Sequence, residues 1–445
     1  MQKIGDLLNY AREEANRGEL ARALHAYGAV IQLQPLNLDA RQRVGEVLLA
    51  LGRPQEAAIV WTALAKLCTH GGHPLRAIVA IKLLSALEPA LEGLLRVLAE
   101  LYAAGSPRLG KGARLSAGDI NQPLPPSLDL SRPPPLPNLI DAVVRLASDL
   151  SGMPFIEKLP PIPVLSTLSA SAFQALLSAV GLFRALPGTA IIREGEPGNA
   201  FYMLASGEVR VLKRNSNAKE GFVELARLHD GAVFGEMALL SAAPRSATVE
   251  AVRESDLLQF HQDALRKIAA ELPSVASALD HFARERLLNN ILATSPLFAP
   301  LDRSNRMALL RRFSSHDVPE GAVIIREGEE GKGLFVVIAG EVEVIKETDG
   351  TPLSLGTLGP GEVFGEISLI DQRPATATVR ATRPSTVLFL DRVIFWRLIE
   401  VVPEIREYLM RLSEERLMDA RLSLESLELK AWEIPIEIDE EENLP

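Results

Sequence analysis

Residues 234–249 read FGEMALLSAAPRSATV, and residues 364–379 read FGEISLIDQRPATATV. Both stretches follow the same hexapeptide, IIREGE, which occurs at residues 191–196 and again at residues 324–329. Short runs rich in β-branched residues surround each copy and end at glycines, which predicts a small antiparallel β-roll. Two copies of one domain, each of about 120–130 residues, are the simplest account.

The first stretch combines residue types that suit a ligand with both a phosphate and hydroxyl groups. Gly235 permits a tight turn and a close approach of backbone to ligand, and residues 237–240 can form one helical turn whose free amides favour an anion. Arg245 offers a planar fork of donors suited to phosphate. Glu236 only accepts hydrogen bonds at neutral pH and suits hydroxyls. A carboxylate and a guanidinium nine residues apart therefore predict a sugar-phosphate site.

This stretch resembles the phosphate-binding cassette of the cyclic nucleotide-binding domain. That family includes regulatory subunits of cAMP-dependent kinase, gated channels and the catabolite activator protein. The residues at the family's spacing are Gly235, Glu236, Ala238, Pro244 and Arg245. The resemblance spans about residues 163–420. It implies that Glu236 holds the ribose 2′-hydroxyl, that Arg245 holds the cyclic phosphate, and that amides near Gly235 and Ala238 complete the anion site.

Ser246 bears on which nucleotide is bound. It directly follows the phosphate arginine of the cassette. Relatives that prefer cGMP often carry a hydroxyl residue there, yet the bacterial catabolite activator also has serine and uses cAMP. The resemblance therefore favours cAMP as the regulatory ligand, with cGMP as the alternative.

Glu236 and Arg245 have a second interpretation, in which they pair with each other and only brace the loop. Surface carboxylate–arginine pairs of this kind are common and contribute little stability. The presence of the whole cassette favours the ligand site over the internal pair.

The second copy departs from the pattern at the residue that would hold the phosphate. Ala375 stands where the first copy has Arg245, although Glu366 is kept. Without the guanidinium, a phosphate beside Glu366 would meet less compensating charge, which disfavours anion binding. We therefore expect a structural, degenerate copy. The alternative is a rearranged site that uses Arg373, two residues earlier.

Residues 1–104 carry apolar residues at three- and four-residue spacing, which predicts amphipathic helices. The repeated positions are Gly18, Ala23 and Tyr27 in one copy and Gly52, Ala57 and Trp61 in the next, 34 residues later. A third, partial copy begins at Ala77 after only 20 residues. The pattern resembles the tetratricopeptide family, whose repeat is a helix–turn–helix. That resemblance implies a groove for a peptide or helix of a protein partner.

Composition divides the remaining chain. Residues 105–162 are rich in proline, which predicts an extended, semi-rigid linker with one short helix within residues 138–150. The predicted organisation is multidomain α+β: tetratricopeptide-like helices (1–104), proline-rich linker (105–162), first cyclic nucleotide-binding domain with connecting helices (163–294), second, degenerate domain (295–420) and acidic C-terminal tail (421–445).

Composition and motifs also exclude several classes of protein. The net charge of −10 argues against a nucleic-acid partner, and no apolar run is long enough for membrane insertion. A single cysteine, Cys68, cannot form an internal disulfide, so we expect a cytoplasmic protein. His70 and His73 lie near Cys68 without an evident fourth ligand, so no metal is expected. No catalytic motif is present, so we expect no enzyme.

The sequence therefore predicts a non-enzymatic cyclic nucleotide sensor, a regulatory adaptor that signals to a protein partner through the tetratricopeptide-like repeats. One alternative is a constitutive scaffold in which neither roll binds a ligand. The other is a protein like a kinase regulatory subunit, which the tandem rolls favour.

Overall fold

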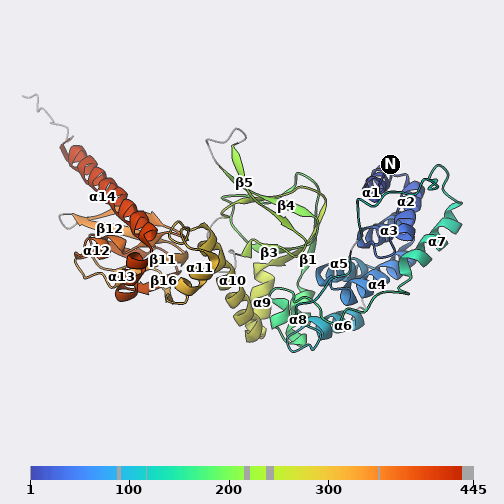
Figure 1. Cartoon of the computed structure of the whole chain (residues 1–445), viewed down its shortest axis with the longest axis horizontal. Helices are drawn as coiled ribbons and strands as arrows, with labels where there is room; N and C mark the ends of the chain where they lie inside the picture. The colour runs from blue at the N-terminus through green and yellow to red at the C-terminus, as the bar shows by residue number, and fades with distance from the viewer. Residues whose placement is uncertain are drawn as a thin grey trace, which may run out of the picture. The chain divides into compact units, whose positions relative to one another are not determined.

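The computed structural model describes residues 2–87, 92–116, 118–214, 221–236, 245–348 and 351–432 (Figure 1). The chain forms two compact units. Of the described residues, those before residue 237 and residues 245–282 belong to the first unit, and residues 283–432 belong to the second. The helical N-terminal region and the first β-roll thus share one unit, and the second roll belongs to the other.

The N-terminal region is a stack of helices in which successive helices pack together. They are α1 (Ile4–Asn16), α2 (Leu20–Leu33), α3 (Leu38–Ala50), α4 (Pro54–His70), α5 (Pro74–Ser85) and α6 (Glu92–Tyr102). Gly18, Gly52 and Gly72 have φ between +71° and +82°, so the chain reverses there without the strain that a side chain would cause. Pro54 and Pro74 begin their helices, where the missing amide hydrogen costs no hydrogen bond.

The repeated aromatic residues fill the space between these helices. Tyr27 and Trp61 are 2% and 1% exposed. A Cβ atom on Gly45 would lie 2.2 Å from Nε1 of Trp61, so any side chain there would displace the indole. The pairs α1–α2 and α3–α4 are compatible with tetratricopeptide-like repeats. Ala77 lies in α5, which follows α4 directly, and this explains why the third copy begins early.

The proline-rich segment is packed, which corrects the expectation of a semi-rigid linker. Its predicted helix is present as α7 (Leu136–Ser148) and lies against α2 and α4. Val143 approaches Gly28 so closely that a Cβ there would lie 2.7 Å from Val143 Cγ2. The buried guanidinium of Arg41 donates to the Ala147 carbonyl oxygen at 2.5 Å. The apolar side chains of the segment join the core of the helices, and their burial outweighs the extended preference of its prolines.

The first roll consists of two four-stranded antiparallel sheets, β1-β8-β3-β6 and β2-β7-β4-β5. Its strands are β1 (Gly181–Ala185), β2 (Ala190–Ile192), β3 (Ala200–Ser206), β4 (Glu208–Arg214), β5 (Phe222–His229), β6 (Val233–Phe234), β7 (Thr248–Ala251) and β8 (Ser255–His261). The flanking helices are η1 (Leu165–Thr167), α8 (Ala170–Ser178), α9 (Gln262–Glu271) and α10 (Pro273–Thr294).

The second roll repeats this topology strand for strand, which confirms the predicted duplication. Its sheets are β9-β16-β11-β14 and β10-β15-β12-β13. The strands are β9 (Ser314–Val318), β10 (Val323–Ile325), β11 (Gly333–Ala339), β12 (Val342–Thr348), β13 (Thr351–Leu358), β14 (Val363–Phe364), β15 (Thr378–Ala381) and β16 (Ser385–Asp391). The helices are α11 (Arg303–Leu310), α12 (Glu366–Ile370), α13 (Arg392–Val401) and α14 (Pro403–Trp432).

The predicted acidic tail at residues 421–445 needs a correction. Residues 421–432 continue α14, because the leucines, glutamates and lysine of this stretch are good helix formers. The rest of the predicted tail lies outside the described residues.

The helical region and the first roll share one hydrophobic core. α5 packs against β3 and β8 of the roll. The buried cluster that contains Leu24 and Trp61 extends without a break to Phe201 and Leu258. The position of the first roll is therefore set by the helices that precede it.

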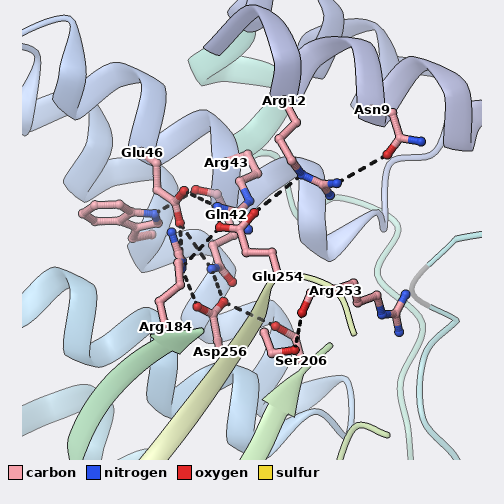
Figure 2. A network of polar contacts seen from close by, with 12 residues as sticks. Asn9, Arg12, Gln42, Arg43, Glu46, Arg184, Ser206, Arg253, Glu254 and Asp256 are labelled. Atoms are coloured by element: carbon pink, nitrogen blue, oxygen red, sulfur yellow. Dashed lines mark hydrogen bonds and ion pairs between the residues drawn. The ribbon is translucent and has the colours of Figure 1, made fainter. Parts of the chain in front are cut away.

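A charged network joins the same two parts (Figure 2). Arg184 on β1 donates to Glu46 of α3 at 2.7 Å and to Asp256 of β8 at 2.7 Å. Gln42 of α3 donates to the other Asp256 oxygen at 2.7 Å. Arg43, also on α3, lies 2.8 Å from Glu254 of the roll. The side of the helical stack that carries these α3 residues is thus covered by the chain's own roll.

The network keeps Asp256 ionised although only 2% of this residue is exposed. Burial alone would raise the pKa of Asp256, but the charge and hydrogen bond of Arg184 lower it overall. Because the pKa is lowered in the folded protein, the stability that Asp256 contributes is present above its ordinary pKa of 3.8. That stability is lost as the pH falls through the folded-state pKa.

Replacing Arg184 with methionine should leave Asp256 buried without its cation. We expect Arg184→Met to lower the free energy of unfolding by about 3 kcal/mol at pH 7, as for breaking one half of a buried ion pair. Urea unfolding followed by circular dichroism measures this loss. Without Arg184, burial should raise the pKa of Asp256 in the folded variant, so the loss should begin to shrink above pH 3.8 as this carboxylate is protonated, and it should shrink further below pH 3.8 as the unaltered protein loses the ion pair.

Arg266→Met is the matched control, because Arg266 forms an exposed pair with Asp263 at 3.6 Å in the same unit. Such pairs contribute little. Equal stability of the two variants at pH 7 would contradict the role assigned to the network.

Candidate functional site

The first cassette begins where β6 ends, at a glycine in the left-handed conformation. Gly235 has φ +79°. A Cβ atom on it would lie 2.9 Å from Ile192 Cδ1 and 3.0 Å from Arg245 Nη1. Both the backbone angle and the surrounding space therefore require glycine at this turn.

Arg245 ties three segments of the roll together. Its Nη1 donates to the Gly235 carbonyl oxygen at 2.9 Å, and its Nη2 donates to the Ala200 carbonyl oxygen at 2.6 Å. Its backbone amide donates to Glu196, and its carbonyl oxygen accepts from Gly195, at 2.8 and 2.9 Å. The cassette, the start of β3 and the IIREGE hexapeptide thus meet at one residue.

The electrostatics of this site favour an anion. Burial lowers the pKa of the half-buried Arg245, while Tyr202 and Glu236 act in the opposite direction. The guanidinium remains charged at neutral pH, as arginine does in proteins. Its two carbonyl acceptors carry no formal charge, so these bonds do not neutralise it. A phosphate in their place would make charge-assisted hydrogen bonds, which are stronger.

The other predicted site residues lie as follows. Glu236 is 7% exposed and follows Gly235 directly, and its charge acts on Arg245. Ser246 is exposed, and its carbonyl oxygen accepts from Lys213 Nζ at 2.7 Å. Ala238 lies outside the described residues. The structure therefore brings Gly235, Glu236 and Arg245 together and leaves Ser246 at the surface beside them.

Sequence reasoning missed the residues that hold the cassette in place. Thr248 Oγ1 accepts from the Glu194 amide at 3.0 Å, and in the second roll Thr378 Oγ1 accepts from the Glu327 amide at 3.0 Å. The threonine at the same place in both copies is a signal that the sequence contained. The Ala200 carbonyl has no such signal, because any residue supplies a carbonyl oxygen.

The second cassette has the same left-handed glycine and the same backbone bonds at its Ala375 as the first has at Arg245, but it lacks the cation. Gly365 has φ +87°. The Ala375 amide donates to Glu329 at 2.8 Å, and its carbonyl oxygen accepts from Gly328 at 2.8 Å. These are the bonds that Arg245 makes through its backbone, so Ala375 occupies the equivalent place with a methyl group instead of a guanidinium.

A different arginine reaches the second site, from a distant helix. Arg416 of α14 donates through Nη1 to Glu366 Oε1 at 2.7 Å and to the Val363 carbonyl oxygen at 2.7 Å. Arg373, the alternative considered from the sequence, lies 2.5 Å from Asp371 and is 47% exposed. Sequence reasoning could not find Arg416, because it lies 50 residues from Glu366 in the sequence. Only the packing of α14 on the roll brings the two residues together.

The described part of the chain has neither a cluster of metal ligands nor a membrane-spanning helix. It contains no cluster of three or more histidine, cysteine, aspartate or glutamate residues arranged to hold a metal ion. Cys68 is buried, and a ring nitrogen of His73 lies 2.6 Å from the Leu115 carbonyl oxygen. None of the described helices has the length and apolar character needed to cross a bilayer.

Comparison with known families identifies both rolls. The model of the family described as "Cyclic nucleotide-binding domain" matches residues 182–271 and residues 315–401. These ranges contain both cassettes. The matches begin at β1 of the first roll and at β9 of the second.

Curated relatives include kinase regulatory subunits. The chain is 30% identical over 243 residues to the cAMP-dependent protein kinase regulatory subunit of Blastocladiella emersonii, covering 54% of this chain and 57% of the relative. It is 29% identical over 245 residues to the cAMP-dependent protein kinase type II regulatory subunit of Drosophila melanogaster, covering 55% and 61%. The chain thus matches less than two thirds of the length of these relatives.

Solved structures include the regulatory domain of Toxoplasma gondii PKA, crystallised with cAMP. It is 26% identical in sequence, with 57% of this chain and 92% of that chain covered and a TM-score of 0.28.

Substituting Gly235 should disturb both the turn and the arginine fork. We expect Gly235→Ala to lower the free energy of unfolding by more than the roughly 1–2 kcal/mol of a left-handed alanine, because its Cβ also meets Arg245 Nη1. Gly195→Ala is the matched control, since Gly195 has φ +85° and nothing within 4 Å of its Cβ position. Chemical unfolding compares the two variants, and equal losses would show that the space around Gly235 is not restrictive.

Proposed function

Because the chain carries two cyclic nucleotide-binding domains in tandem, we propose that it is a non-enzymatic regulatory adaptor that binds one cyclic nucleotide, cAMP, in the first roll. The observation that carries this proposal is the half-buried guanidinium of Arg245, which bonds to two neutral carbonyl oxygens beside Glu236. A cyclic phosphate can take the place of these acceptors and gain a charge-assisted bond.

Glu236 and Ser246 would complete recognition of the nucleotide. The Glu236 carboxylate accepts hydrogen bonds and suits the ribose 2′-hydroxyl. Ser246 lies next to Arg245 at the surface, where its hydroxyl can contact the base edge. Amides near Gly235 and Ala238 would bond to the remaining phosphate oxygens.

The same arginine offers a route for the signal. Arg245 bonds to the Ala200 carbonyl, and the preceding residue, Asn199, accepts a hydrogen bond from the Gln262 amide at the start of α9 at 2.8 Å. A phosphate that draws the guanidinium away from Ala200 would alter the peptide next to this hydrogen bond at the start of α9. The nucleotide then shifts the balance between two arrangements by binding one of them more tightly.

The proposed partner is a protein, reached through the tetratricopeptide-like helices. The α3 side of these helices is occupied by the first roll through Arg184 and Arg43. A partner would therefore bind another face of the helical region or compete with the roll. The likeness to kinase regulatory subunits favours a protein kinase as one candidate partner. A constitutive scaffold with two non-binding rolls is the rival function, and the binding measurements described next decide between the two.

Isothermal titration of the full chain with cAMP and cGMP tests the site. We expect one cyclic nucleotide per chain, tighter binding of cAMP, and a loss of about 1.5–3 kcal/mol in Arg245→Ala, the contribution of a hydrogen bond to a charged group. That loss corresponds to a dissociation constant roughly 10- to 150-fold larger.

Arg373→Ala is the matched control in the second roll, because Arg373 is the arginine of the rearranged-site alternative. The affinity of Arg373→Ala for cAMP, and the number of cAMP molecules that it binds, should equal those of the unaltered chain. Unchanged affinity in Arg245→Ala would remove Arg245 from the site, and two cyclic nucleotides per chain would show that the second roll also binds one.

Hydrogen exchange tests the proposed route of the signal. Saturating cAMP should change the protection of amides at residues 262–271, because the first of them bonds to the peptide beside Ala200. The change should be absent in Arg245→Ala at the same cAMP concentration. Identical exchange of α9 with and without bound cAMP would refute the switch while leaving the binding site intact.

A further inference from the structure

The second roll encloses a cavity of about 360 Å³ between its strands and α14. Pockets of this size accommodate small organic ligands. One part of its wall is apolar and includes Ile325, Val344, Leu355, Leu358, Val379 and Leu412. The other part is polar and contains Glu366, Ser368 and Arg416. The second roll therefore keeps an open cavity beside Glu366, although Ala375 stands in the place of the arginine.

The charges around this cavity oppose an anionic ligand. Among the described residues that line it, Arg416 is the one cation, and it is paired with Glu366. Three further carboxylates line the cavity, those of Glu362, Glu415 and Asp419. A phosphate entering here would meet an excess of negative charge, whereas an uncharged ligand would not.

The polar end nevertheless keeps the group that suits hydroxyls. Glu366 is 1% exposed and has the place in its cassette that Glu236 has in the first. Its carboxylate has two oxygens that accept hydrogen bonds. Ser368 Oγ donates to the Gly365 carbonyl oxygen at 3.0 Å, which leaves the lone pairs of the hydroxyl oxygen as acceptors. A ligand with hydroxyl donors can therefore be held at this end.

The backbone of the two cassettes indicates which kind of uncharged ligand fits. Ala375 and Arg245 make equivalent backbone hydrogen bonds to the turn that precedes β3 or β11, so these two residues occupy the same place in their rolls. The second roll has the counterpart of Glu236, for which we propose a bond to ribose, and lacks the counterpart of Arg245, for which we propose a bond to phosphate. The apolar wall is the remaining part, and it suits a flat base.

We propose that the second roll binds an uncharged nucleoside and excludes cyclic nucleotides. Glu366 accepts hydrogen bonds from the ribose hydroxyls, the base contacts the apolar wall, and Arg416 holds α14 over the ligand as a positioning residue. This inference goes beyond nucleotide binding in the first roll, and it rests on that proposed function in one respect, because the ribose role of Glu366 follows from the role proposed for Glu236.

The test uses the full chain with Arg245→Ala, so that the first roll does not obscure the second. Isothermal titration is carried out with adenosine, guanosine, cAMP and cGMP, after circular dichroism has shown that each variant is folded. We expect one site per chain for at least one nucleoside, and at least tenfold weaker binding of the corresponding cyclic nucleotide.

Two added substitutions assign the site. Glu366→Gln should weaken nucleoside binding about tenfold, because the charge-assisted bond to the ribose hydroxyl becomes a neutral one. Ala375→Arg, which restores the cation at the equivalent place, should strengthen cAMP binding at least tenfold. Arg373→Ala is the control, because Arg373 forms an exposed pair with Asp371 and neither residue lines the cavity. This substitution should change neither the affinity for the nucleoside nor the affinity for cAMP.

The proposal is overturned if neither nucleoside binds the folded Arg245→Ala chain, or if cAMP binds it as tightly as adenosine. It is also overturned if Glu366→Gln leaves nucleoside affinity unchanged. The two proposals fail separately. Absence of cAMP binding to the unaltered chain contradicts the function proposed for the first roll, whereas the nucleoside titration still decides the second.

Discussion

The first roll depends on the position of one guanidinium. Arg245 joins the cassette to the start of β3 through its side chain and to the IIREGE turn through its backbone. Its charge is partly removed from water while its two acceptors are neutral, so it stabilises the loop and still favours an anion. This arrangement requires glycine at position 235, because a Cβ atom there would lie 3.0 Å from Nη1 of the Arg245 guanidinium.

The two rolls show that the backbone bonds of the cassette can stay the same while the charges around it change. Both cassettes bond to the preceding turn in the same way and both begin at a left-handed glycine. What differs is the balance of charge near the carboxylate that both cassettes contain, Glu236 in the first and Glu366 in the second. In the first roll an arginine of the cassette itself lies beside Glu236, whereas in the second roll Arg416 of α14 pairs directly with Glu366. Equivalent backbone bonds thus support the anion site that we propose in the first roll and the site for a neutral molecule that we propose in the second.

The helical region is more than an appended module, because it shares a core with the first roll. Charged residues surround this core, and Arg184 compensates the buried charge of Asp256 while also bonding to α3. An interface of this kind is specific, since any other arrangement leaves a buried carboxylate without its partner. It also couples the helices to the roll that carries the proposed nucleotide site.

Local pattern was enough to predict the helices and the duplicated rolls, and it also singled out Gly235, Glu236 and Arg245, which the structure brings together. Those features depend on spacing along the chain, which amphipathic periodicity and turn glycines record directly. The packing of the proline-rich segment and the pairing of Arg416 with Glu366 were decided only by tertiary structure. Each of these depends on contacts between residues distant in sequence, where burial and charge compensation outweigh local preference.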